Sequence, residues 1–195
     1  MKIKKVIDIC KGTGRISLYD GKNEQWISDG YACYPLYGMP KLDKETLCST
    51  YDIAETQAEK IHFQHDKGLP EFIEECDRRS FIGSSPVSQE QIRLIFNNRT
   101  LIPFILAYSI AFVDEKYFQP FMDIDGDLIN VYEYVYEGIK GFAVYSGMVL
   151  IGIIGAYDVV KDRFVKQLGE IYSRCKLELD RTKNDAGQQS FIEEN

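Results

Sequence analysis

The fold is decided by the stretch FAVYSGMVLIGIIGAYDVV, residues 142–160, which holds two apolar runs around a glycine turn. Runs of this kind predict strands at 142–145 and 148–154, joined through Ser146-Gly147. A second stretch, ISLYDGKNEQWISDGYACYPL at residues 16–36, also has a glycine turn followed by a long apolar strand. Each stretch leads toward a predicted helix, so the pair predicts a weak structural duplication. Chance similarity between common hairpin–helix units is the competing interpretation.

The rest of the chain predicts an order of elements that is typical of the α+β class. Apolar residues at helical spacing predict helices, whereas period-two alternation predicts strands. A doubly wound fold needs regular strand–helix alternation, which this order lacks, so we expect mainly antiparallel sheet with packed helices. The predicted helices are residues 2–11, 43–51, 114–124 and 163–179, and the predicted strands are 15–19, 24–34, 60–65, 89–96, 100–106, 109–113 and 128–136.

A charged, irregular stretch that contains several Gly and Pro residues, 66–86, divides the chain. We therefore expect one domain over residues 1–182, built from two related halves at about 1–66 and 87–182. The polar segment 183–195 is expected to be a mobile tail.

Composition limits the class of protein. The 195 residues carry a formal net charge of −7, with 45% hydrophobic and 27% charged residues, which is ordinary globular usage. The acidic balance argues against a generally basic nucleic-acid binder but permits a local basic strip. No apolar run approaches the roughly 18 residues of a membrane span, so no membrane association is expected. Five cysteines without a C-x-x-C pair indicate free thiols, and hence a cytoplasmic location.

No stretch carries a convincing catalytic signature. The two histidines, His62 and His65, point to opposite faces of a predicted strand, which is a poor arrangement for one metal ion. Neither histidine is placed to serve as a base for a cysteine nucleophile. We therefore expect a protein that is not an enzyme and that needs no cofactor. The cysteines on predicted apolar faces are interpreted as small buried hydrophobic residues: Cys10, Cys33, Cys48 and Cys175.

The acidic run DIDGD, Asp123–Asp127, resembles the start of a calcium loop, because hard cations bind clustered carboxylate oxygens. Its sixth position is Leu128 instead of glycine, and its twelfth is Tyr134 instead of glutamate. An acidic turn between a helix and a strand is the interpretation that these departures favour.

Aromatic residues make up 13% of the chain and cluster on predicted strands. Tyr132, Tyr134 and Tyr136 share one face of the strand at 128–136, because side chains alternate along a strand. That face is interpreted as core, with an oligomer interface as the alternative.

Several stretches resemble the module of a DNA sliding clamp. In that module a strand leads to a helix with an aromatic and apolar face, and further strands follow, the last rich in aliphatic residues. The stretches that carry the resemblance are IAFVDEKYFQPFMDI (110–124), LINVYEYVY (128–136), the run from 141 to 159, WISDGYACYPL (26–36) and MPKLDKETLCSTYDI (39–53).

The whole chain is also similar to uncharacterised proteins carried by phages and mobile elements of Gram-positive gut bacteria. The shared stretches are LYDG (18–21), QWISDGYA (25–32), YPLYGMP (34–40) and the helix at 164–168. This similarity implies a phage or integrated-element origin and gives no activity.

The clamp resemblance implies helices whose Lys and Arg side chains face DNA phosphates without reading bases. The predicted helix at 114–124 departs from that pattern, because Asp114, Glu115 and Asp123 outweigh Lys116. The residues expected to form a DNA-facing basic strip are Lys2, Lys4, Lys5, Lys11, Lys161, Arg163 and Lys166.

The resemblance therefore implies a non-enzymatic DNA-metabolism accessory or scaffold protein with a clamp-like fold. Its expected partners are double-stranded DNA and replication proteins of the host or phage. One chain supplies about one clamp domain, so a ring would require a homo-oligomer. The alternative, which the sequence leaves open, is a protein–protein interaction module that modulates host proteins without binding nucleic acid.

Overall fold

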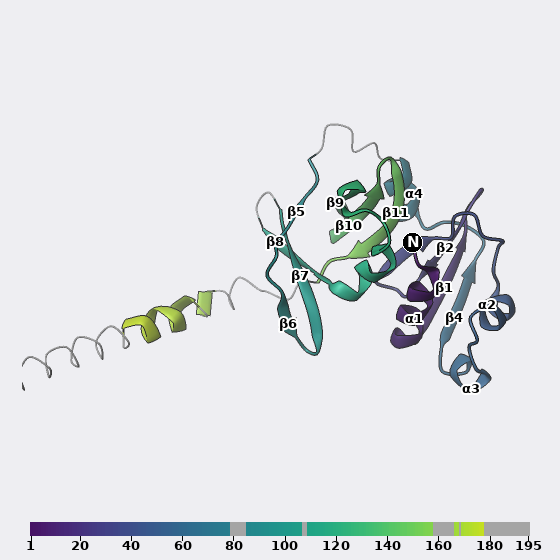
Figure 1. The fold of residues 1–195 in the computed structure, drawn as a ribbon, viewed down its shortest axis with the longest axis horizontal. Helices are drawn as coiled ribbons and strands as arrows, with labels where there is room; N and C mark the ends of the chain where they lie inside the picture. The colour runs from purple at the N-terminus through teal and green to yellow at the C-terminus, as the bar shows by residue number, and fades with distance from the viewer. Residues whose placement is uncertain (79–84, 107–108, 158–165, 168, 178–195) are drawn as a thin grey trace, which may run out of the picture. The chain divides into compact units, whose positions relative to one another are not determined.

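The computed structural model describes residues 1–78, 85–106, 109–157, 166–167 and 169–177. The chain divides into two compact units, 1–157 and 158–195, and each is described by itself. All the named strands lie in the first unit (Figure 1). In the second unit, residues 166–167 and 169–177 are helical. None of the helices in the described part of the chain is long and apolar enough to cross a membrane.

The first unit has an α+β fold, as the sequence predicts, with one seven-stranded mixed sheet and a smaller antiparallel sheet. Its first segment is a helix followed by a three-stranded meander. The helix α1 ends at Gly14, whose φ of +70° suits the left-handed cap that glycine tolerates best. The elements of this segment are α1 (Ile3–Thr13), β1 (Arg15–Asp20), β2 (Gln25–Ser28) and β3 (Ala32–Pro35).

The last segment of the unit repeats this order of elements. A 3-10 helix precedes a second three-stranded meander, whose first turn has φ of +49° at Glu137 and +80° at Gly138, as a tight two-residue hairpin requires. The predicted hairpin through Ser146-Gly147 is confirmed. The elements are η1 (Glu115–Phe121), η2 (Gly126–Leu128), β9 (Ile129–Tyr136), β10 (Ile139–Ser146) and β11 (Val149–Gly155).

The two meanders join edge to edge in one sheet, with the strand order β4-β1-β2-β3-β11-β10-β9. From β1 to β9 this order reads the same from both ends, since the third strand of each meander lies at the centre. The central pairing is short, with Ile153 opposite Cys33 and Ile154 opposite Ala32. All neighbours in the sheet are antiparallel except β1 and β4. By order of elements, the turn at Gly21 therefore corresponds to the turn at Gly138.

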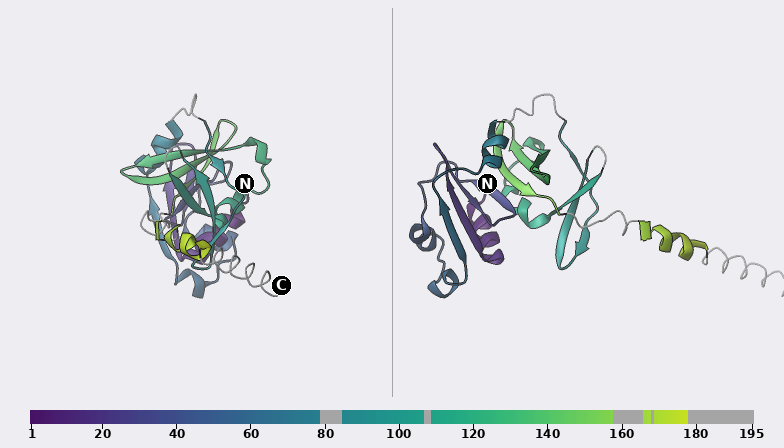
Figure 2. Two further views of the ribbon diagram at one scale, coloured as in Figure 1. Left: turned by 90° about the vertical axis from the view of Figure 1, so that its left-hand side faces the viewer. Right: turned by 180° about the vertical axis from the view of Figure 1, so that it is seen from behind.

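The segment between the meanders supplies the second sheet and most of the short helices (Figure 2). The predicted turn at Asn97-Asn98 is confirmed, with φ of +47° and +58°. The elements are α2 (Lys44–Thr50), α3 (Glu55–Ala58), β4 (His62–Asp66), α4 (Glu71–Arg78), β5 (Ser88–Gln89), β6 (Leu94–Phe96), β7 (Arg99–Ile105) and β8 (Ile110–Asp114).

Two local predictions differ from the structure. The stretch 66–86, predicted to be irregular, contains α4, which follows Pro70 and carries Glu71 and Glu74 in its first turn. These are helix-start signals, but the helix spans only eight residues, too few to show a long apolar period. The helix predicted at 114–124 is the 3-10 helix η1, which contains Pro120. Proline inside an α-helix removes a backbone donor and clashes with the preceding turn.

Core residues lie on both faces of the large sheet. On one face of the sheet, α1 and η1 pack with β7 and β8. There the centroids of the Phe104 and Phe142 rings lie 4.8 Å apart. On the other face α4 covers a smaller cluster that includes Trp26. Tyr145 fixes α4 to this face by donating a hydrogen bond of 2.8 Å to the backbone oxygen of Cys76.

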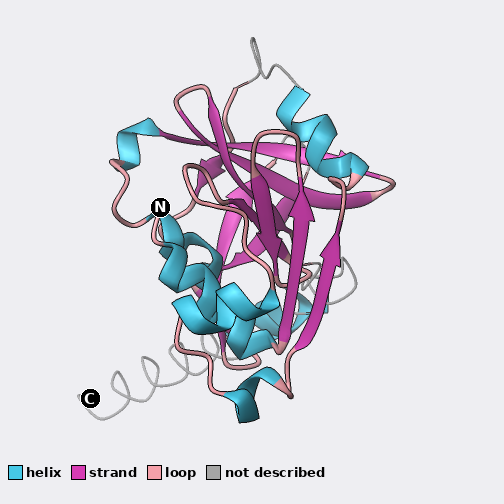
Figure 3. Ribbon diagram, turned by 90° about the vertical axis from the view of Figure 1, so that its right-hand side faces the viewer, coloured by secondary structure: helices cyan, strands magenta, loops and turns pink. Residues whose placement is uncertain are grey.

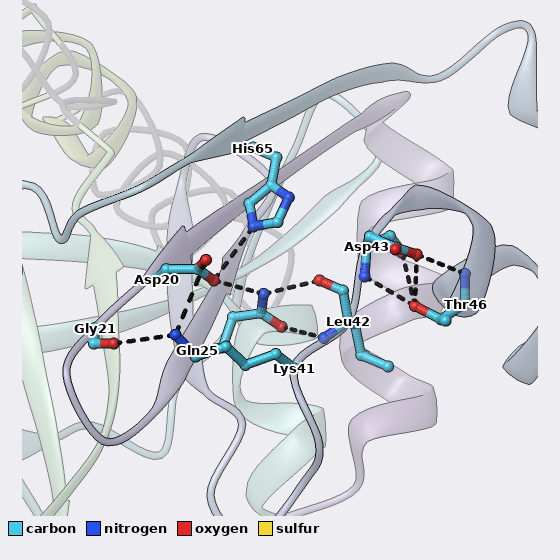
Figure 4. A network of polar contacts seen from close by, with 8 residues as sticks. All are labelled: Asp20, Gly21, Gln25, Lys41, Leu42, Asp43, Thr46 and His65. Carbon is cyan, nitrogen blue, oxygen red and sulfur yellow. Dashed lines mark hydrogen bonds and ion pairs between the residues drawn. The ribbon is translucent and has the colours of Figure 1, made fainter.

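A polar network holds the loop before α2 against the β1–β2 hairpin (Figure 4). The Gln25 side chain donates to Asp20 Oδ1 and to the Leu42 backbone oxygen, both at 2.8 Å, and accepts from the Leu42 N–H at 2.9 Å. His65 and Lys41 also face Asp20. Burial by itself would raise the pKa of Asp20. The hydrogen bonds from Gln25 and His65 and the nearby cationic groups have a larger opposite effect, so the net result is a pKa below the ordinary value.

We expect Gly152→Ala to lower the free energy of unfolding by about 1–3 kcal/mol, because the core is close-packed there. A Cβ at Gly152 would lie 2.7 Å from Phe121 Cζ. Gly12→Ala is the matched control: Gly12 lies in α1 with open space around it, so the change is expected to stabilise by about 0.5–1 kcal/mol. Urea denaturation measures both, and equal effects would contradict the contact between β11 and η1.

We expect the stability of the protein to depend on the ionisation of Asp20. Because its pKa is lower in the folded protein than in the unfolded chain, the carboxylate stabilises the fold above about pH 4, and this contribution is lost as the pH falls. Asp20→Asn should therefore lower the free energy of unfolding more at about pH 7 than at about pH 3. Chemical denaturation at both pH values tests this, with the exposed Glu59 changed to Gln as control. The same loss at both pH values would exclude the ionised carboxylate as its source.

Candidate nucleic-acid interface

The candidate interface is the exposed side of α1, together with η1, which packs beside it. The two elements are joined at the start of α1, where the Lys2 N–H donates to the Pro120 backbone oxygen at 2.8 Å. The Lys2 Nζ atom also lies 2.7 Å from Asp123 Oδ1. In Figure 3, α1 is the helix that begins beside the N label. Both helices thus contribute side chains to one surface.

Hydrogen bonds to the first meander fix the position of η1 on the sheet. Tyr117 Oη donates to Asp29 Oδ2 at 3.0 Å, and Tyr34 Oη donates to the Tyr117 backbone oxygen at 2.9 Å. Asp29 is buried in the β2–β3 turn, where it also accepts the N–H groups of Tyr31 and Ala32. Burial and the charge of Asp29 raise the pKa of Tyr117, so its hydroxyl stays protonated and remains a donor.

The amphipathic pattern of α1 places its lysines on the solvent side. Lys4 and Lys5 are exposed, while Lys11 is half-buried in the last turn, where a cation also favours the negative end of the helix dipole. Asp8 is the exposed acidic residue of this helix. The side that faces the core carries Val6, Ile7, Ile9 and Cys10.

The acidic residues predicted to oppose DNA binding are engaged in local ion pairs. Glu115 Oε1 lies 3.0 Å from Arg93 Nε, and Asp123 pairs with Lys2. Asp114 is buried and lies 4.0 Å from Lys116 Nζ. Within the described residues, Lys4, Lys5 and Lys11 make no ion pair, and they face one acidic residue on their own helix, Asp8. Three lysines against one aspartate leave two net positive charges on the solvent side of α1.

The structure brings together four of the seven residues predicted for the basic strip, namely Lys2, which precedes α1, and Lys4, Lys5 and Lys11 on α1. Lys161 and Arg163 lie outside the described residues. Lys166 is exposed on a helix of the second unit, which is described by itself. The described interface is therefore α1 with η1.

The other candidate residues have local structural environments. Cys10 and Cys33 are buried, and burial raises the pKa of the Cys33 thiol to about 12. The prediction that Cys175 is buried is wrong, because it is exposed, and Cys48 is half-buried. Cys48 lies on the seven-residue helix α2, and the described residues around Cys175 are all exposed, so an apolar spacing did not guarantee burial.

The acidic run at 123–127 forms a turn in which Asp125 Oδ1 accepts the Asp127 N–H at 3.2 Å. Across the described ranges, no three His, Cys, Asp or Glu side chains are grouped so that they could hold a metal ion. Of the strand face predicted as core, Tyr134 is buried, whereas Tyr132 and Tyr136 are half-buried.

Comparison of the chain with protein-family models, with curated proteins and with solved structures gives no match.

Proposed function

We propose that this protein is a non-enzymatic accessory of DNA metabolism with a clamp-like fold, and that α1 contacts the phosphates of double-stranded DNA. The observation that carries the proposal is the repeated order of a helix followed by three strands. Its two helices pack together on one face of a continuous sheet, and Lys4 and Lys5 of α1 are exposed. A phage or mobile-element origin, implied by the sequence resemblance, is part of the same proposal.

The charge distribution supports backbone contact in preference to base reading. Lysine is a flexible point charge, which suits a phosphate contact that tolerates any sequence. The pairing of Asp123 with Lys2 and of Glu115 with Arg93 reduces the repulsion that these carboxylates would exert on DNA. With about three contributing lysines, binding is expected to be weak and to depend steeply on salt.

A second candidate function, a protein–protein interaction module, is favoured by a different surface. The small sheet of β5–β8 exposes large apolar side chains, and two of them, Ile105 at 45% and Ile110 at 60% of their full area, are cross-strand partners. Neighbouring exposed apolar side chains of this kind mark contacts with other proteins more often than they mark nucleic-acid binding. Ile95 and Phe96 lie toward the other end of the same sheet and are also exposed.

The DNA proposal is tested by fluorescence anisotropy with a labelled duplex at increasing salt. We expect a slope of log K against log[salt] of about −3, for about three phosphate contacts. Lys4→Glu with Lys5→Glu should reduce the magnitude of that slope by about 2 and abolish most of the binding. The matched control is Lys22→Glu with Lys67→Glu, which makes the same charge change at exposed lysines outside α1. Absence of binding at about 50 mM salt, or equal losses in both variants, would contradict the proposal.

The interaction-module candidate predicts association that does not involve DNA. Sedimentation velocity over a range of concentrations should then show assembly that Ile105→Asp with Ile110→Asp removes, because burying a charge without a partner is costly. The Lys4→Glu and Lys5→Glu variant should assemble normally. Assembly that persists after both isoleucines are changed would exclude the small sheet as the contact.

A further inference from the structure

An apolar groove of about 310 Å³ lies where the start of α1 meets the loop after η1 and the β10–β11 hairpin. Pro35 and Ile151 are its buried residues, whereas Tyr37 and Val149 are 44% and 50% exposed. Apart from Ser146, every lining residue is apolar or aromatic. The remaining lining residues are half-buried: Met1, Ile3, Ile124 and Ser146.

Hydrogen bonds outside the groove hold its walls in place. Tyr37 Oη donates to the Leu150 backbone oxygen at 3.0 Å, which fixes the tyrosine ring against β11. The Gly147 N–H donates to the Leu128 backbone oxygen at 3.0 Å and joins the β10–β11 hairpin to the loop that contains Ile124. A partner would therefore meet walls that are positioned before it binds, which reduces the entropic cost of binding.

Exposed methionines flank the groove along the chain. Met148, which precedes Val149, is 92% exposed, and Met122, two residues before Ile124, is 76% exposed. Methionine is unbranched and adapts its shape to different apolar partners. Exposed apolar side chains next to an apolar groove are typical of a surface that binds another protein.

The loop side of the groove is acidic. Asp125 and Asp127 are exposed in the loop that follows Ile124, and neither forms an ion pair with another described residue. Lys2 is the one lysine in the segments that line the groove, and its Nζ atom lies 2.7 Å from Asp123 Oδ1. The carboxylates of Asp125 and Asp127 are therefore available to a cationic group of a partner.

The Tyr37 side of the groove is acidic as well. Burial raises the pKa of Tyr37 to about 12, and the negative charges of Asp77 and Glu24 act in the same direction, so both carboxylates lie within electrostatic reach of the ring. Asp77 is exposed and Glu24 is half-buried. A partner that carries Lys or Arg beside its apolar side chains complements both sides of the groove.

The charge and the lining of the groove disfavour other occupants. The carboxylates of Asp125 and Asp127 repel the phosphates of a nucleic acid. Two copies that met symmetrically through this face would bring the same two carboxylates of each copy together, and like charges across an interface are costly. A polar small molecule would find few groups to orient it, because the Tyr37 hydroxyl is engaged on Leu150 and Ser146 is the one other polar side chain.

From these observations we propose that the groove binds a short segment of a partner protein, which presents two or three large apolar side chains with Lys or Arg beside them. Apolar anchors that enter a groove are a common mode of peptide recognition. The proposal does not rest on the proposed DNA contact, since Lys4 and Lys5 do not line the groove and the test changes neither.

The probe is a phage-displayed library of random peptides of about twelve residues, selected on the full-length protein. Fluorescence anisotropy then measures the enriched peptides. We expect these peptides to share large apolar residues flanked by Lys or Arg, and to bind with a dissociation constant below about 100 μM. Their affinity should fall as salt is raised, because the flanking charges are solvent-exposed and screened.

Two variants test the apolar walls. Ser146→Trp places a large side chain in the groove and should weaken the peptides at least about tenfold. Val149→Ser removes apolar surface from the rim and should weaken them about fivefold. Val135→Ser is the matched control for the second variant, because Val135 is 44% exposed on β9 and does not line the groove, so it should leave the dissociation constant unchanged.

A third variant, Asp125→Asn with Asp127→Asn, tests the charges and should weaken the peptides about fivefold at low salt, with a smaller effect at high salt. Its control is Glu55→Gln with Glu59→Gln, which removes two exposed carboxylates from α3. Thermal unfolding verifies that each variant is folded.

Three results would overturn the proposal. The first is that no selected peptide binds below about 100 μM, or that the selected peptides lack apolar residues or carry acidic flanks. The second is binding that survives both Ser146→Trp and Val149→Ser in folded protein. The third is self-assembly of the wild-type protein in sedimentation velocity that Val149→Ser removes, which would assign the groove to a second copy.

Discussion

The buried carboxylate of Asp29 is the contact on which the arrangement of the first unit depends. It accepts two backbone N–H groups within its own turn and the hydroxyl of Tyr117 from η1. The same turn leads into β3, whose pairing with β11 comprises two residue pairs. A short strand pairing contributes few hydrogen bonds, so side-chain contacts across it carry more of the connection. An acceptor buried without its donors would cost about 1–3 kcal/mol or more, which favours the one arrangement that satisfies it.

The sequence predicted the local elements well and their long-range contacts poorly. Turn residues with positive φ, such as Asn97 and Asn98, identified hairpins because their chemistry is local. The pairing of β3 with β11 joins segments more than a hundred residues apart, and no local pattern indicates such a partner. Asp29 looked like an ordinary turn residue for the same reason, since its third donor, Tyr117, is 88 residues away.

At the candidate sites, too, local features were predicted and long-range contacts were missed. The lysines on α1 were predicted from helical spacing, and Lys4 and Lys5 are exposed as expected. The ion pair between Lys2 and Asp123 was missed, so the sequence overstated both the basic charge of α1 and the acidic charge beside it. Tyr134 and Tyr136 were both interpreted as core from the alternation along their strand, but Tyr134 is buried whereas Tyr136, near the end of β9, is half-buried.

The strand β4 distinguishes the two ends of the large sheet. It runs parallel to β1 and covers that edge, whereas β9 has no named strand beyond it in the described part of the chain, only a hydrogen bond from the Val87 N–H to Val131. The internal repetition therefore stops short of true twofold symmetry. The two edges of the sheet are therefore unlike strands, β4 and β9. A contact between β9 of two copies would close as a dimer, whereas a contact of β4 with β9 would leave an edge free at each end and would permit growth into fibres.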